Sequence, residues 1–373
     1  MTAFNDLQLL QPILKALQEE QYHQPTPIQQ KTIPEILKGH DILACAQTGT
    51  GKTAAFAIPI LQAIHNRQTS SKLPQALVLC PTRELAIQVE ESFITYGRYL
   101  SVRCLALYGG VSQVNQEKEL KRKVDVIVAT PGRLLDFIQQ ELLDLSGIHH
   151  LVLDEADRML DMGFIHDVKR ILRFIPEKRQ TLFFSATMQG EVQKLAQSIL
   201  NNPVQVKVNP VSSTATKIQQ SVYYVEQKEK TALLLSLIKT KGLERTLVFT
   251  RTKYGADRLC KQLKKQGIQS AAIHGDKSQG ARQKALTDFK KSQLQILVAT
   301  DIAARGIDID DLGFVVNYEI PNIPETYVHR IGRTGRAGQE GMAISFCNPE
   351  EKTHLKNIQK LIGDAVPEAT LNN

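Results

Sequence analysis

The sequence predicts an α/β protein with two tandem domains, each a mostly parallel sheet flanked by helices. The chain has 373 residues, which is too long for a single ordinary hydrophobic core. Short apolar, β-branched runs alternate with helical patterns, which is typical of parallel sheets covered on both faces. The two halves also repeat each other, because LVLCPTRE (77–84) resembles LVFTRTKY (247–254) and VIVATPGR (126–133) resembles ILVATDIAARG (296–306). We therefore expect two copies of one domain.

The apolar runs form two series of predicted strands. The first series covers 41–46, 76–80, 124–130, 151–154 and 181–185, and the second covers 246–250, 270–274, 295–300, 314–318 and 342–347. Between them, 201–217 contains two prolines and a Ser/Thr cluster, which predicts a short strand followed by a linker. The expected organisation is an N-terminal region at 1–30, a first domain at 31–209, a linker at 210–216 and a second domain at 217–373.

Composition excludes several classes of protein. With 42% apolar and 23% charged residues, the chain is expected to be globular and soluble. The five cysteines are scattered without a C-x-x-C pair, which argues against a disulfide framework or a zinc site and suits a reducing cytoplasm. The N-terminus has no basic region before an apolar core, and no run approaches the ~20 apolar residues of a membrane span. We expect a cytoplasmic protein that does not bind membranes.

The net charge of +8 is unevenly distributed. Residues 1–209 carry 22 basic and 21 acidic side chains, whereas 210–373 carry 24 and 17, so the two parts have net charges of +1 and +7. A basic excess in one half favours a polyanionic partner. A well-solvated surface explains the charge equally well when it is considered alone.

The stretch AQTGTGKT (46–53) predicts a loop that binds nucleotide phosphates. It follows a predicted strand and opens a helical segment, which is the setting that such a loop requires. Gly49 and Gly51 let backbone N–H groups turn toward phosphate oxygens. Lys52 is placed to reach the β- and γ-phosphates, and the Thr53 hydroxyl to ligate Mg²⁺. Ala46 stands where the pattern usually has glycine, which a wider turn accommodates.

The predicted strand at 151–154 runs into two carboxylates, Asp154 and Glu155. Asp154 can hold Mg²⁺ through water, and Glu155 is placed to orient or deprotonate the attacking water. An acidic helix start is the alternative interpretation.

Together with AQTGTGKT, the run D-E-A-D at 154–157 resembles the DEAD-box RNA helicases of superfamily 2. Further motifs follow the order of that family along nearly the whole chain: YHQPTPIQQ (22–30), PTRELA (81–86), GG (109–110), TPGR (130–133), SAT (185–187), VFTRT (248–252), ATDIAARGIDI (299–309) and HRIGRTGR (329–336). The runs DRMLDMGFIH, HGDKSQGAR and VVNYEIP resemble the bacterial RhlE-type subgroup most. The resemblance implies two RecA-like domains, ATP and Mg²⁺ as ligands, and an RNA-stimulated ATPase that unwinds RNA.

The motif at 22–30 resembles the segment with which the family recognises adenine. The Gln29 amide can pair with adenine N6 and N7, Tyr22 offers a stacking face, and Phe4 matches an upstream aromatic. We expect Gln29→Ala to weaken ATP binding and leave GTP binding nearly unchanged, unless Gln29 is merely solvated. One departure is Gln21, where the family usually has glycine. The resemblance extends the nucleotide contacts to Ala46, Gln47, Thr48, Gly49, Thr50, Gly51, Lys52, Thr53 and Asp308.

The motif HRIGRTGR places Arg330, Arg333 and Arg336 at intervals of three, on one face if the segment is helical. Such a cluster suits an anion such as a γ-phosphate, with a solvated basic face as the alternative. The resemblance implies that Arg333 and Arg336 are arginine fingers. It also implies that His329 couples to a region around Asp157, Ser185 and Thr187.

The resemblance also supplies an RNA surface in both domains. Its residues offer backbone N–H, hydroxyl and charge rather than base recognition, so binding should be largely independent of sequence. They are Thr82, Arg83, Gly109, Gly110, Thr130, Pro131, Gly132 and Arg133 in the first domain, and Arg251, Gln279, Arg282, Thr300, Asp301 and Gly306 in the second.

The expected function is therefore an ATP-dependent RNA helicase. Because the arginine fingers and the phosphate loop lie in different domains, hydrolysis should require the domains to close. We expect a monomer, whose partners in ribosome assembly or RNA decay the sequence does not identify. After 342–347 the sequence has one helical segment, 351–366, and no Arg/Gly-rich tail, so the RNA contacts should lie between the domains. An ATP-gated RNA clamp and a DNA translocase are the alternatives.

Overall fold

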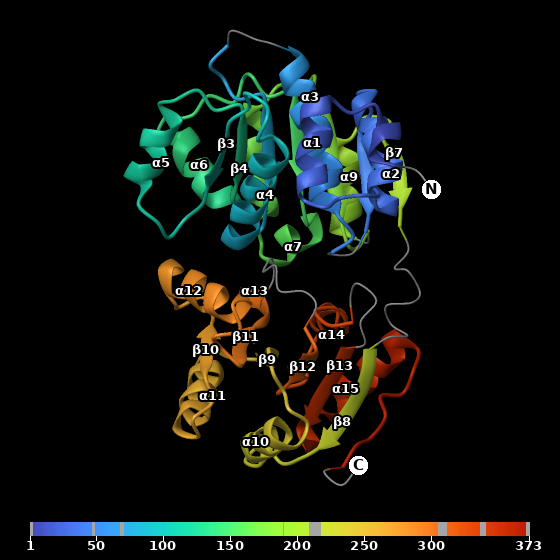
Figure 1. Cartoon of the computed structure of the whole chain (residues 1–373), viewed down its shortest axis with the longest axis vertical. Helices are drawn as coiled ribbons and strands as arrows, with labels where there is room; N and C mark the ends of the chain where they lie inside the picture. Colours follow the sequence, from blue (N-terminus) through green and yellow to red (C-terminus); the bar gives the residue numbers. More distant parts are fainter. Residues whose placement is uncertain are drawn as a thin grey trace. The chain divides into compact units, whose positions relative to one another are not determined.

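The computed structural model describes residues 3–46, 49–67, 71–188, 190–208, 218–304, 312–335 and 341–370. Backbone contacts divide the chain into two compact units, Met1–Pro210 and Val211–Asn373 (Figure 1). The linker expected at 210–216 lies outside the described residues. Each unit contains a parallel sheet flanked by helices, which confirms the predicted fold class.

The first unit contains a sheet whose strands run in the order β3-β4-β2-β5-β6-β1-β7, and every described pair is parallel. In chain order its elements are η1 (Phe4–Leu7), α1 (Gln11–Glu19), α2 (Pro27–Leu37), β1 (Ile42–Cys45), α3 (Lys52–Arg67), β2 (Ala76–Leu79), α4 (Arg83–Tyr96), β3 (Cys104–Leu107), α5 (Gln113–Leu120), β4 (Val126–Ala129), α6 (Pro131–Gln139), β5 (His150–Leu153), α7 (Ala156–Asp161), α8 (Ile165–Ile171), η2 (Leu172–Phe174), β6 (Gln180–Ser185), α9 (Glu191–Ile199) and β7 (Val204–Lys207).

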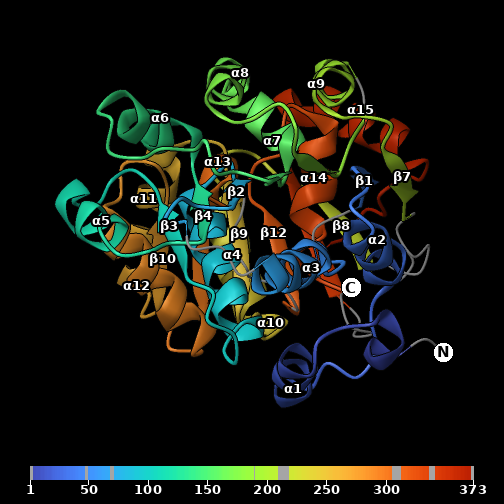
Figure 2. The ribbon, with the colours of Figure 1, turned by 90° about the horizontal axis from the view of Figure 1, so that it is seen from above.

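Two hydrophobic cores cover the two faces of this sheet. Successive residues of a strand point to opposite faces, so Val78 packs into one core and Leu77 into the other. Helices α1 to α4 close the first face and α6 to α9 the second, as the view in Figure 2 shows for α3 and α4 against α7 to α9. Burial on both faces explains why β2 and β4 read as continuous apolar runs.

The second unit contains a parallel sheet with the order β10-β11-β9-β12-β13-β8. Its elements are β8 (Ile218–Tyr224), α10 (Lys230–Thr240), β9 (Thr246–Thr250), α11 (Lys253–Lys265), β10 (Ser270–Ile273), α12 (Gln279–Lys290), β11 (Ile296–Thr300), α13 (Asp301–Ala304), β12 (Phe314–Asn317), α14 (Pro324–Ile331), β13 (Gly341–Cys347), η4 (Pro349–Glu351) and α15 (Lys352–Ile362). Adjacent residues of β9 again divide between faces, with Val248 in one core and Phe249 in another.

Two strands were not among the predicted runs, β3 and β8. Strand β8 reads IQQSVYY, and its polar residues hide the pattern because it lies at an edge of the sheet. It pairs with β13 on one side and makes a single bridge, from Val222 to Glu368, on the other. No helix in the described ranges is long and apolar enough to cross a membrane.

Candidate functional site

The predicted site residues of the first unit follow the carboxyl ends of its strands. The phosphate loop follows β1, the acidic pair follows β5, and Ser185 ends β6; these three strands are neighbours in the sheet. The predicted RNA residues follow β2, β3 and β4, which form the other part of the same sheet. Because all the strands are parallel, both groups lie at one edge, where open α/β sheets bind ligands.

The phosphate loop has the backbone that its glycines allow. Gly49 and Gly51 have φ values of +81° and +88°, a left-handed conformation that favours glycine. Lys52 is buried, and its Nζ donates to the carbonyl of Ala46 at 3.0 Å. The Ala46 N–H in turn donates to Ser185 O at 3.0 Å, which fixes the start of the loop to β6. Gln47 and Thr48 lie outside the described residues.

Gln29 of α2 holds the phosphate loop from the side. Its Oε1 accepts from the Thr26 N–H at 2.9 Å, and its Nε2 donates to Gly51 O at 3.1 Å. The Thr26 hydroxyl donates to Thr50 O at 2.8 Å. A Cβ on Gly51 would lie 2.4 Å from Gln29 Nε2, so this close approach requires glycine. The alternative of a solvated Gln29 is wrong, because only 3% of the residue is exposed.

The amide of Gln29 retains capacity for a base. A primary amide has two N–H donors and an oxygen with two lone pairs, and the contacts to Thr26 and Gly51 use one of each. The sequence indicated the base contact but not the contact to the loop.

The aromatic residues of the N-terminal region differ in exposure. Phe4 is buried in the core, whereas 41% of Tyr22 is exposed, with its hydroxyl 3.3 Å from that of Tyr96. Gln21 has a φ of +59°. The Tyr22 N–H donates to Leu17 O and the Gln21 N–H to Gln18 O, which is the Schellman pattern that ends α1. Gln21 therefore occupies a position where glycine is favoured, and the turn forms nonetheless.

Asp154 is buried beside the phosphate loop. Burial raises the pKa of its carboxyl to about 6, against the opposing effect of the nearby Lys52 ammonium. Its Oδ1 has no hydrogen-bond partner among the described residues. Within those residues, no group of three or more His, Cys, Asp or Glu side chains could hold a metal ion. Mg²⁺ in a nucleotide site needs only one or two carboxylates, with phosphates and water as its other ligands, so Asp154 and Thr53 fit that ion.

Glu155 adopts a left-handed conformation, with φ +52° and ψ +50°, as the residue that precedes α7. Its Oε2 lies 2.5 Å from Nη1 of Arg158, and both side chains are buried. A non-glycine residue in this conformation is uncommon and is found at functional sites. Sequence reasoning missed Arg158, although its spacing of three residues from Glu155 on a helix start was a usable signal.

Asp157 joins the acidic segment to the loop after β6. Its Oδ2 accepts from the N–H groups of Ala186 and Thr187 at 3.2 and 3.0 Å and from the Thr187 hydroxyl at 3.3 Å. The Ser185 hydroxyl donates to Thr187 O at 2.6 Å. The structure thus brings together the three residues that the resemblance assigned to coupling; their role in coupling stays a prediction.

Two of the predicted RNA motifs of the first unit are in contact. A Cβ on Gly110 would lie 1.9 Å from Nη1 of Arg83, so the guanidinium lies directly on the Gly109–Gly110 turn. Thr82 caps α4 by accepting from the Leu85 N–H at 3.3 Å.

The third segment of that surface begins α6. Thr130 is its N-cap, Pro131 its first residue, and Gly132 has no atoms within 4 Å of an added Cβ. Arg133 donates to Gln116 and to Val111 O, both at 3.4 Å.

In the second unit, the condition for a shared arginine face, a helix through the whole motif, is not met between Arg330 and Arg333. Helix α14 ends at Ile331, with Gly332 as its C-cap, so Arg330 and Arg333 do not share a helix face. Arg330 is buried: its Nε and Nη2 donate to the two oxygens of Asp301 at 2.6 and 2.7 Å, and Nη1 donates to Asn317 and to Glu319 O. Its guanidinium also stacks over Phe249, with 4.9 Å to the ring centroid.

The predicted RNA residues of this unit lie at or after the ends of β9, β10 and β11, which are neighbours in the sheet, whereas His329 lies in α14 and Arg333 just after it. Both oxygens of the Asp301 carboxylate accept from Arg330. Residues at the other positions that the structure describes are Arg251, Gln279, Arg282, Thr300, His329 and Arg333. Gly306, Asp308 and Arg336 lie outside the described residues.

Comparison with known proteins identifies the family. Residues 26–195 match the DEAD/DEAH box helicase model, and 229–338 match the helicase conserved C-terminal domain. The chain is 46% identical over 360 residues to the DEAD-box ATP-dependent RNA helicase CshA of Geobacillus kaustophilus, covering 96% of this chain and 76% of that protein. It is 42% identical over 364 residues to RhpA of Helicobacter pylori, covering 98% and 73%.

Among solved structures, S. cerevisiae Dbp5 bound to RNA and ADP BeF3 matches with a TM-score of 0.89 and 32% identity, over 100% of this chain and 96% of that one. The match extends through both parallel sheets and therefore confirms two tandem RecA-like domains. The phosphate loop, the acidic segment after β5 and this similarity agree, and the chain belongs to the DEAD-box family of ATP-dependent RNA helicases.

Proposed function

We propose that this chain couples the binding and hydrolysis of ATP to closure of its two units on RNA, which separates short duplexes or remodels RNA–protein complexes. The observation that carries the proposal is the arrangement at one sheet edge of the first unit. There Lys52, Asp154 and Glu155 adjoin the Gln29-supported loop, and the Arg83–Gly110 contact lies at the ends of β2 and β3 in the same sheet. One sheet thus offers a nucleotide site and a backbone-binding surface together.

Each residue of the nucleotide site has a role that its position supports. Lys52 exchanges its contact with Ala46 O for the β- and γ-phosphates, while Gln29 and Tyr22 receive adenine. Glu155 accepts the proton of the attacking water, and Arg158 holds its carboxylate in place. Arg333 and Arg336 supply positive charge to the γ-phosphate when the units close, with His329 contacting the Asp157 region.

Mg²⁺ would be held by Asp154 and Thr53. When bound, the ion would neutralise negative charge on the phosphates. The buried Oδ1 of Asp154, which has no hydrogen-bond partner within the described part of the chain, supports this assignment.

The RNA surface should read backbone and not bases. Arg83 on a glycine turn and the open N-terminus of α6 offer charge and N–H groups, which suit phosphates of any sequence.

The proposed organisation is an N-terminal region at 1–30, a first domain at 31–209, a linker at 210–216 and a second domain at 217–373. We also propose that the protein is a monomer and belongs to the RhlE-type subgroup. The five free cysteines favour a reducing cytoplasm.

The test is ATP hydrolysis with and without RNA, followed by RNA affinity with and without a non-hydrolysable ATP analogue at several salt concentrations. We expect hydrolysis to depend on RNA, affinity to increase markedly with the analogue, and affinity to fall steeply with salt. Hydrolysis that RNA does not stimulate would indicate a clamp. Equal stimulation by DNA would indicate a DNA translocase.

A further inference from the structure

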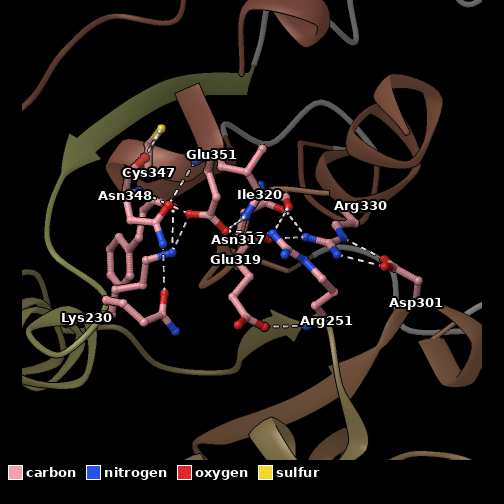
Figure 3. A network of polar contacts seen from close by, with 12 residues as sticks. Lys230, Arg251, Asp301, Asn317, Glu319, Ile320, Arg330, Cys347, Asn348 and Glu351 are labelled. Carbon is pink, nitrogen blue, oxygen red and sulfur yellow. Dashed lines mark hydrogen bonds and ion pairs between the residues drawn. The ribbon is translucent and has the colours of Figure 1, made fainter. Parts of the chain in front are cut away.

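A buried carboxylate in the second unit lies outside every motif named above and beyond both family-model matches. Glu351, the last residue of η4, is 3% exposed and divides its two oxygens between two sets of donors (Figure 3). Oε2 accepts from Nζ of Lys230 at 2.5 Å and from the Asn348 N–H at 3.1 Å. Oε1 accepts from Nη2 of Arg251 at 3.0 Å and from the Ile320 N–H at 3.1 Å.

We propose that Glu351, held by Lys230, is a positioning residue that fixes the guanidinium of Arg251 for an RNA phosphate. The inference rests on the proposed function, in which Arg251 contacts RNA. It places buried supporting residues, from the start of α10 and from η4, behind the RNA surface that the motifs predict.

Lys230 cannot act on RNA itself. Its side chain is wholly buried, and Nζ donates to Phe346 O at 3.3 Å as well as to Glu351. A buried lysine and carboxylate must be paired and hydrogen-bonded to offset their loss of water. The lysine therefore holds one oxygen of the Glu351 carboxylate in place, and the other oxygen contacts Arg251.

Arg251 is the member of the network that reaches solvent, with 42% of its side chain exposed. Nη2 donates to Ile320 O at 3.2 Å and to Glu351, and its backbone N–H donates to Glu319 Oε2 at 2.6 Å. Among the described residues, Nε and Nη1 have no hydrogen-bond partner. A guanidinium is planar, so fixing Nη2 also orients the Nε–H and Nη1–H groups, each of which can donate a charge-assisted hydrogen bond to a phosphate oxygen.

Positioning and simple electrostatics predict opposite signs. Glu351→Gln removes a negative charge near an RNA surface, which by charge alone should tighten RNA binding. If Glu351 positions Arg251, the same substitution should weaken it. Glu350→Gln is the matched control, because it makes the same charge change at the preceding, exposed residue of η4.

The experiment measures affinity for a labelled single-stranded RNA with a non-hydrolysable ATP analogue, across salt concentrations, alongside thermal melts. We expect Arg251→Met to bind roughly tenfold more weakly, with a salt slope reduced by about 0.7 for one lost phosphate contact. Glu351→Gln should bind RNA several-fold more weakly than the wild type. The double variant Arg251→Met/Glu351→Gln should bind RNA no more weakly than Arg251→Met alone. Glu350→Gln should bind at least as tightly as the wild type.

Because Glu351→Gln leaves Lys230 buried without a carboxylate, a second variant is needed. Lys230→Met/Glu351→Gln removes the unpaired cation and should melt nearer to the wild type while keeping the weaker RNA binding. Wild-type affinity in either folded variant, or losses that add to that of Arg251→Met, would overturn the inference. The inference would also be overturned if Arg251→Met bound RNA as tightly as the wild type while RNA still stimulated its ATPase activity. That result would leave the helicase function intact.

Discussion

Replacing Gln29 by alanine should weaken both nucleotides, but ATP more than GTP. The variant loses the hydrogen bonds to the Thr26 N–H (2.9 Å) and to Gly51 O (3.1 Å), which order the phosphate loop for any nucleotide. At about 0.5–1.5 kcal/mol each, these bonds account for roughly 1–3 kcal/mol of loop stability. Loss of a bidentate contact to adenine removes a further ~1–3 kcal/mol from ATP alone. The preference for ATP over GTP should therefore fall by about 5- to 150-fold.

Equilibrium titration with fluorescent ATP and GTP analogues measures both losses. Gln30→Ala is the control, because Gln30 is the exposed neighbour whose amide donates to Pro25 O at 2.8 Å. An unchanged ratio of the two affinities would refute base recognition by Gln29. Unchanged GTP affinity would instead refute the contribution of its contact with Gly51, and would restore the simpler expectation from the sequence.

Three further predictions concern the same unit. Glu155→Gln should bind ATP and RNA while its turnover of ATP falls about 10²- to 10⁴-fold, because the proton acceptor is lost. Normal turnover of ATP by this variant would contradict the assignment of Glu155. Lys52→Ala should instead lose nucleotide binding. Asp154 has a folded pKa of about 6 against 3.8 for the ordinary group, so its burial lowers the free energy of unfolding increasingly as pH rises from about 4 to 6. In EDTA and without nucleotide, Asp154→Asn should therefore be more stable than the wild type by up to about 3 kcal/mol at pH 7.5, and should lose that advantage near pH 4. Equal melting temperatures of the two proteins at both pH values would contradict this prediction. Gln21→Gly should gain about 1 kcal/mol by relieving a left-handed conformation, seen as a higher Tm with unchanged ATP affinity, and a lower Tm would show that the Gln21 side chain contributes more than its backbone costs.

Much of the fold was predictable because its strands are buried on both faces. The run at 246–250 predicted β9 to the residue, and the other predicted runs match strands within a few residues, since such strands are short, apolar and bounded by polar turns. Strand β8 escaped because an edge strand retains polar residues. Periodicity carries no signal for a strand of that composition.

The candidate site was predictable one motif at a time, but its internal contacts were not. Each motif places its residues after a strand, and parallel pairing brings the strand ends together. The bond from Gln29 to Gly51 joins residues 22 positions apart, and that from Arg251 to Glu351 joins residues 100 apart. Such contacts depend on packing between elements, which local patterns do not encode.

The arginines of HRIGRTGR show how equal spacing can conceal unequal roles. Arg330 is the last arginine inside α14, and all three of its nitrogens donate to protein acceptors, with Asp301 cancelling its charge. A phosphate could recruit this guanidinium only by breaking a buried ion pair, which is strongly unfavourable. Arg333 follows the end of the helix, two residues beyond Ile331, where its position is set by the turn and not by a helical face. We therefore expect any anion at this motif to contact Arg333 and Arg336, which follow Gly332, and not Arg330, whose three nitrogens already donate to protein acceptors.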